Sequence, residues 1–208
     1  MNSKLSNSMI VVLLLCPLVP GTGRFAYGLY LAIALFFILF FAVTSRFLVL
    51  KSGFKETEHY VTLLFVISGA VIFNKVMSFF LPVLAYTLEF YVYLSAFSGL
   101  VLFFLFSKET ETAFAGDFKG ILGNVFFVSI KFFILFLFFG ALREIAGYGS
   151  LSVPVFSGIR VISLFHVADY PLFKFAASTE GGLVVSAIMI CIFRYSYVRY
   201  ESEKRKVN

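Results

Sequence analysis

The sequence is poor in charged residues and in cysteine, and it contains no tryptophan. Only 13% of its 208 residues are charged, whereas 61% are hydrophobic. A soluble globular domain has roughly 25% charged and about 45–50% apolar residues. The shortage of charge therefore excludes a soluble domain and a disordered chain, and it indicates an integral membrane protein. The two cysteines, Cys16 and Cys191, are too few for a disulfide framework or for a tetrahedral metal site within this chain alone.

The charge that is present is mainly basic, with a formal net charge of +6 at pH 7. In a membrane protein, an excess of Lys and Arg marks the cytoplasmic side of the bilayer. The same excess on a soluble protein would suggest binding to nucleic acid phosphates. We therefore expect the lipid bilayer to be a partner of this chain and expect no nucleic acid partner.

Long apolar stretches predict the membrane spans, because a helix that crosses a bilayer needs about 20 mostly apolar residues. A shorter run, Met9–Val19, contains Pro17 and is followed by Pro20, so we expect it to lie against protein rather than lipid. A cleaved signal peptide is the alternative for this run, but no small-x-small cleavage pattern follows it. Five stretches are long enough to cross: Phe25–Leu50, Tyr60–Tyr86, Leu88–Phe106, Ile121–Ile145 and Gly181–Val198.

The distribution of Lys and Arg predicts the orientation of these spans. With six crossings, most basic residues fall on the side of the N-terminus, including the cluster in the tail 199–208. Because cytoplasmic loops carry the excess of Lys and Arg, we predict that both termini are cytoplasmic. The long loop Gly149–Glu180 would then be external. The external side would hold Arg24, Arg143, Arg160 and Lys174.

A phenylalanine-rich string suggests an internal repeat. The residues 36–40, Phe-Phe-Ile-Leu-Phe, recur at 132–136, and an arginine follows each copy. Chance similarity is the alternative, because the chain contains 30 Phe. A short or interrupted segment also precedes each copy. These segments are Met9–Val19 and the stretch Leu88–Phe106, which contains the small residues Ser95, Ala96, Ser98 and Gly99.

A unit of three crossings that is repeated once must be inverted in the membrane. The sequence therefore predicts a single all-α membrane domain over residues 1–208. Six transmembrane helices would form two inverted three-helix repeats, at about 9–86 and 88–198, with short or interrupted first and fourth helices. A basic cytoplasmic tail, 199–208, would follow. Inverted repeats with interrupted segments at matching positions indicate a site near the middle of the membrane.

Cys16 is the first candidate for chemistry. It stands beside Pro17 in a broken helix, where backbone donors without helical partners favour a thiolate that can bind an iron–sulfur cluster. The alternative is ordinary packing of a small apolar side chain. Cys191 lies in the middle of the last predicted span and is a weaker candidate for the same role.

Polar and charged residues within the spans are candidates for an ion path. Asn74 and Lys75 fall in the second of the five long stretches, and Lys131 falls in the fourth. Ionisable residues are costly in a membrane and mark functional sites there. The alternatives are pairing between helices and snorkelling of the long Lys side chains. We expect Arg143-Glu144, at the end of a span, to anchor a helix end.

Three stretches resemble the small membrane subunits of Rnf and sodium-translocating Nqr complexes, of the RnfA/RnfE and NqrD/NqrE type. Residues 13–19, Leu-Leu-Leu-Cys-Pro-Leu-Val, are similar to the first-helix signature Leu-Gly-Leu-Cys-Pro of that family. Residues 140–151, Gly-Ala-Leu-Arg-Glu-Ile-Ala-Gly-Tyr-Gly-Ser-Leu, are similar to its fifth-helix stretch Gly-Ala-Leu-Arg-Glu-Ile-x-Gly-x-Gly. Residues 113–115, Ala-Phe-Ala, match its Glu-Ala-Phe-Ala, with Thr112 in place of Glu. The resemblance runs in order over nearly the whole chain.

The resemblance implies a six-helix inverted-repeat subunit that pairs with a homologous sister subunit. In that family, each subunit offers one cysteine from its first and one from its fourth helix, and the four thiolates hold a 2Fe–2S cluster. The cluster passes electrons across the membrane, and this flow is coupled to sodium or proton translocation. Here Cys16 matches the first ligand, but Gly99 or Leu105 stands where the second would be, and Asn74 replaces an acidic residue.

These observations predict a divergent membrane subunit of a redox-driven ion translocase, which is not an enzyme on its own. Cys16 would be its ligand to a 2Fe–2S cluster shared with the sister subunit, and Cys191, the sister subunit or a non-cysteine ligand would complete the site. A structural role without a cluster is the alternative for this subunit. A second hypothesis is a small-solute transporter, such as the substrate-binding membrane component of a vitamin uptake system. In that case the loop Gly149–Glu180 would cap the ligand.

Overall fold

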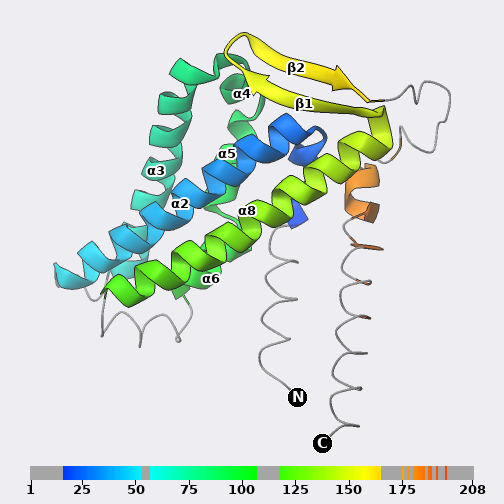
Figure 1. Cartoon of the computed structure of the whole chain (residues 1–208). Helices are drawn as coiled ribbons and strands as arrows, with labels where there is room; N and C mark the ends of the chain where they lie inside the picture. The colour runs from blue at the N-terminus through cyan, green and yellow to red at the C-terminus, as the bar shows by residue number, and fades with distance from the viewer. Residues whose placement is uncertain are drawn as a thin grey trace, which may run out of the picture.

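The structure is a computed structural model of the whole chain (Figure 1). It describes residues 16–52, 57–106 and 118–164, and further along residues 175, 178, 180–185, 187, 188, 191 and 195. The first part of the Met9–Val19 run and the predicted basic tail, 199–208, lie outside the described residues.

The described chain is mainly helical. A short 3-10 helix leads into the first long helix, and a two-stranded hairpin follows the last long one (Figure 1). The helical elements are η1 (Cys16–Thr22), α2 (Phe25–Lys51), α3 (Glu58–Phe80), α4 (Pro82–Thr87), α5 (Glu89–Ala96), α6 (Gly99–Phe106) and α8 (Phe118–Tyr148).

Helix α2 is the centre of the fold. It packs against α3, α5, α6 and α8, so many of its apolar side chains are buried, among them Leu31, Leu35 and Ile38. Helices α2 and α8 lie side by side and run in opposite directions (Figure 1). Their backbones approach closely at Gly28, where a Cβ would lie 3.5 Å from the Cα of Gly140.

Within the part of the chain that the structure describes, three helices are long and apolar enough to cross a membrane: Phe25–Lys51, Glu58–Phe80 and Val125–Tyr148. They coincide with three of the five long stretches expected to span, and they support a membrane-embedded protein. The six crossings and the two inverted repeats stay predictions, because the described residues contain these three long apolar helices and shorter ones.

Two of the predicted spans are broken. The expected helix Tyr60–Tyr86 is divided at Leu81, because Pro82 disfavours the helical conformation of the residue before it. The expected interrupted helix Leu88–Phe106 is indeed interrupted, since α5 ends at Ala96 and α6 begins at Gly99.

The expectation of an all-α fold is wrong in one place. The predicted loop Gly149–Glu180 contains an antiparallel hairpin, β1 (Ser150–Val155) and β2 (Gly158–Ser163), which lies across the end of the helices (Figure 1). Its physical cause is local, because both segments are rich in Val and Ile, which favour extended backbone. The turn uses Gly158 at a φ of +138°, a conformation that a Cβ would oppose.

Candidate functional site

Glu144 caps the start of helix α2 from another helix. Residue Arg24 precedes α2 in an extended conformation and provides no side-chain cap, so the first backbone N–H groups need acceptors. The N–H of Phe25 donates to Oε2 of Glu144 at 2.7 Å. Because a helix N-terminus carries partial positive charge, the carboxylate at the end of α8 suits this position.

The hairpin completes the environment of this carboxylate. Ser152 donates its hydroxyl to Oε2 of Glu144 at 2.7 Å, and Ser150 donates to Oε1 at 3.3 Å. The oxygen of Ser152 also accepts the N–H of Ala26 at 3.2 Å. Glu144 is fully buried, yet both of its oxygens have donors. The carboxylate therefore joins α8, β1 and the start of α2.

Arg143 makes a second set of buried contacts beside the first. Its guanidinium donates to the carbonyl of Val19 at 2.7 Å and to the hydroxyl of Thr22 at 3.0 Å, both in η1. It also donates to the carbonyl of Ser178 at 2.7 Å. Gly182 lies so close that a Cβ there would be 2.6 Å from Cζ of Arg143.

We name these contacts of Arg143 and Glu144 the Arg143–Glu144 anchor. It ties together η1, α2, α8, the hairpin and the segment around Ser178 at one end of the helices. The expectation that Arg143-Glu144 anchors a helix end is confirmed, and the anchored helix is α2 rather than the one that carries the two residues.

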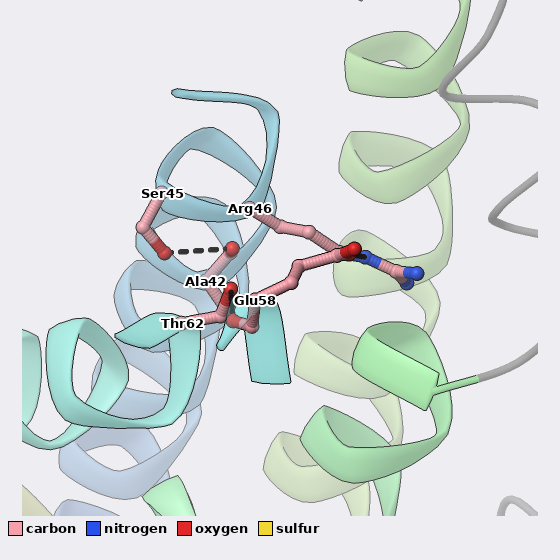
Figure 2. A network of polar contacts seen from close by, with 5 residues as sticks. All are labelled: Ala42, Ser45, Arg46, Glu58 and Thr62. Atoms are coloured by element: carbon pink, nitrogen blue, oxygen red, sulfur yellow. Dashed lines mark hydrogen bonds and ion pairs between the residues drawn. The ribbon is translucent and has the colours of Figure 1, made fainter. Parts of the chain in front are cut away.

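The other end of α2 holds a buried ion pair. Nε of Arg46 lies 3.3 Å from Oε1 of Glu58, at the start of α3, and the two side chains are 2% and 14% exposed (Figure 2). Thr62 donates its hydroxyl to the backbone carbonyl of Glu58 at 2.7 Å. Arg46 and Arg143, which follow the two copies of the repeated string, are thus both buried, near opposite ends of an antiparallel helix pair.

A third polar group lies inside the bundle, on α2, α3 and α5. The hydroxyl of Tyr30 donates to Oδ1 of Asn74 at 3.4 Å, and the hydroxyl of Tyr93 donates to Oε1 of Glu89 at 2.9 Å. The two pairs lie near one another, because both α2 and α3 pack against α5. We name these four residues the Tyr30–Glu89 network. Tyr30 and Asn74 are buried, whereas Glu89 and Tyr93 are partly exposed.

The residues proposed for an ion path do not face the same environment. Asn74 is buried in the Tyr30–Glu89 network, but its neighbour Lys75 is on the exposed surface of α3. Lys131 is exposed on α8, where its ammonium lies 4.4 Å from the centre of the Phe127 ring. The structure therefore brings Asn74 together with Glu89, which the sequence analysis did not select, rather than with the two lysines.

The cysteines are not brought together with other ligands in the described residues. Cys16 begins η1, and its side chain lies outside what the structure describes; Cys191 is exposed and free of a disulfide. Leu105, one of the two positions where the fourth-helix cysteine would stand, is buried in the apolar core. In the described segments, no three His, Cys, Asp or Glu side chains gather closely enough to hold a metal ion.

This arrangement does not fit the complete ligand set of the resembled family. A 2Fe–2S cluster held by two subunits needs two thiolates from each, and the break between α5 and α6 offers Gly99 where one of them would be. The nearby hydroxyl of Ser95 donates to the carbonyl of Val92, within its own helix. We therefore assign no electron-transfer step to the described residues.

Comparison with known proteins gives one distant relative. A protein of Treponema pallidum (strain Nichols), whose name is given as "Uncharacterized protein", is 25% identical to this chain over 178 residues. The aligned region covers 85% of this chain and 83% of that protein. No family model matches the chain.

Proposed function

We propose that this chain is a divergent membrane subunit of an ion-translocating redox complex of the Rnf/Nqr type. It would act in a bacterial inner membrane, with a homologous sister subunit and further redox subunits, and would not be an enzyme alone. The observation that carries the proposal is the Arg143–Glu144 anchor, because residues 140–151, on which the resemblance mainly rests, build it.

Several residues of that stretch have a definite role in the fold. Arg143 and Glu144 hold five segments together, and Gly140 lets α8 approach α2 closely. Gly149 ends the helix at a φ of +62°, and its N–H donates to the carbonyl of Ile145 at 3.1 Å. A match by chance between apolar sequences would not be expected to include two fully buried ionisable residues that contact several other segments.

The arrangement of the helices also supports two inverted halves. Helices α2 and α8 carry the two copies of the repeated string and run in opposite directions (Figure 1). Each helix has a buried arginine close to its C-terminal end, Arg46 or Arg143, and each arginine fixes a different end of the bundle. The interruption between α5 and α6 is at the position where the proposal requires a broken fourth helix.

The Tyr30–Glu89 network is the part of the chain that we propose to handle the transported cation. It offers a carboxylate and an amide oxygen, which are ligand types that hard cations prefer, and two tyrosine hydroxyls that donate to them. No described lysine or arginine lies within ion-pair distance of Glu89. Glu89 is partly exposed on a bundle that we propose to lie in a membrane, where an ionisable group is costly unless it is compensated, so a cation or a proton at Glu89 would relieve that cost.

The experiment that tests the proposal is anaerobic purification of the tagged chain from its native membrane. We expect the sister subunit and flavin-binding and NADH-binding subunits to co-purify, identified by mass spectrometry and by flavin absorbance. Purification with an energising ATPase pair, and without flavin, would contradict the proposal and support a small-solute transporter.

The same preparation tests the cofactor. We propose that Cys16 of this chain is a ligand of a 2Fe–2S cluster that is shared with the sister subunit. Iron quantitation and low-temperature EPR on wild type and Cys16→Ala should show a cluster signal that is lost in the variant. A signal that the substitution leaves unchanged would refute Cys16 as a ligand, without affecting the membership of the complex.

A further inference from the structure

The outward face of the β1–β2 hairpin is apolar. Ser150 and Ser152 point toward the helices, where they donate to Glu144, so alternation turns Val153 away from them. The strand register places Ile162 and Arg160 on the same outward face. Val153 is 38% exposed and Ile162 is 50% exposed. The outward face of an antiparallel ribbon on a soluble protein is commonly polar. The apolar outward face of this hairpin is therefore not suited to contact with water.

Exposed apolar side chains also occur at the turn and at one position of the inward face, although the serines of that face are buried against the helices. Val161 pairs with Ser152 and so belongs to the inward face, yet it is 48% exposed beyond the helix ends. Phe156, in the turn, is 69% exposed. A docked protein would cover one of these surfaces, whereas a layer of lipid reaches the outward face, the turn and Val161 together.

The position of the hairpin at the end of the long helices indicates its depth in the bilayer. Helix α2 has 27 residues and is roughly 40 Å long, which exceeds a hydrocarbon core of about 30 Å, so its ends reach the interface. Near the hairpin, Tyr86 and Tyr148 are exposed, and the guanidinium of Arg24 lies 5.4 Å from the centre of the Tyr148 ring. Tyr side chains are typical of the membrane–water interface.

The backbone of the hairpin excludes a deeper position. A two-stranded sheet leaves backbone N–H and C=O groups along both outer edges, and such groups are not tolerated in the hydrocarbon core. In the headgroup region, water and polar lipid groups satisfy them. The exposed guanidinium of Arg160 is also suited to this region, where lipid phosphates are available.

We propose that the β1–β2 hairpin is an interfacial element that inserts its Val, Ile and Phe side chains among the lipid headgroups. The lipid bilayer is the binding partner of its outward face, of its turn and of Val161, and the hairpin fixes the depth of α2 and α8 in the membrane. This inference depends on the chain being embedded in a membrane and is independent of the redox function proposed above.

The absence of tryptophan from the chain makes a direct test possible. In the full-length chain, Ile162→Trp and Val161→Trp place single fluorophores on opposite faces of the ribbon. Each variant is reconstituted into vesicles whose lipids carry bromine either near the headgroup or near the chain end. We expect both variants to lose most of their fluorescence with the shallow label and less of it with the deep label.

Phe127→Trp is the matched control, because this exposed position of α8 lies within a candidate span. It should be quenched by brominated lipid but not by iodide in the water. Quenching of Ile162→Trp by iodide and not by lipid would place the hairpin in water and overturn the proposal. Protection of either hairpin variant from both quenchers would show that protein covers that face, which would also overturn it.

Discussion

The hydroxyl of Ser152 provides the sharpest test of the Arg143–Glu144 anchor, because it is both a donor and an acceptor there. Ser152→Ala removes the donor to the Glu144 carboxylate, which is 2.7 Å away, and the acceptor of the Ala26 N–H, which is 3.2 Å away. A hydrogen bond to a charged group contributes about 1.5–3 kcal/mol, and a neutral one about 0.5–1.5 kcal/mol. We therefore expect Ser152→Ala to lower the free energy of unfolding by about 3 kcal/mol.

Two serines of the same hairpin serve as matched controls. Ser150→Ala removes one longer bond to Glu144, at 3.3 Å, so its expected cost is about 1 kcal/mol. Ser163, opposite Ser150 in the sheet, is exposed, and Ser163→Ala should change the stability by less than about 0.5 kcal/mol.

The assay is reversible unfolding in mixed micelles by titration with SDS, followed by far-ultraviolet circular dichroism. The expected order of cost is Ser152→Ala, then Ser150→Ala, then Ser163→Ala. If Ser152→Ala were as stable as Ser163→Ala, the hairpin would not support Glu144 as the cap of α2, and the assignment would be refuted.

Two further predictions concern close packing and the buried ion pair. Gly182→Ala would place a Cβ 2.6 Å from Cζ of Arg143, so it should lower the melting temperature. The control is Gly120→Ala, where a Cβ would meet nothing within 4 Å; it should raise the melting temperature slightly because alanine favours helix. A Gly182→Ala variant as stable as wild type would contradict the first prediction. Arg46→Gln and Glu58→Gln should each cost about 1.5–3 kcal/mol in the SDS titration, because each removes a hydrogen bond between two charged groups, one of them buried. The double substitution should cost less than the sum of the two, and strict additivity would show that the pair is not coupled.

The long helices were the most predictable part of this fold. The apolar run expected at Phe25–Leu50 is helix α2, Phe25–Lys51, because a continuous apolar stretch of that length has few other stable structures in a membrane. The break at Leu81 was also accessible, since Pro82 marks it in the sequence. The prediction of one helix over Tyr60–Tyr86 followed the length of the apolar stretch and did not use the signal of Pro82, which was correct.

The hairpin and the polar network were harder to predict. The rule that reads membrane spans from long apolar runs does not detect strands of six residues, so Ser150–Ser163 was expected to be a loop. Glu89 and Asn74 lie on different helices, and only the packing of α3 against α5 brings them together. By contrast, consecutive helical residues point about 100° apart, and Lys75 lies on the exposed surface of α3 although its neighbour Asn74 is buried.

Redox-driven cation transport tests the central claim most directly. Inverted vesicles from cells that lack this chain, and from cells that express it again, are supplied with reductant while cation uptake is recorded. The account predicts that uptake is lost without the chain and is restored by wild type and by the exposed-site control Glu180→Gln. Glu89→Gln should allow assembly but restore little uptake. Equal uptake in vesicles with and without the chain would contradict its role in a redox-driven translocase.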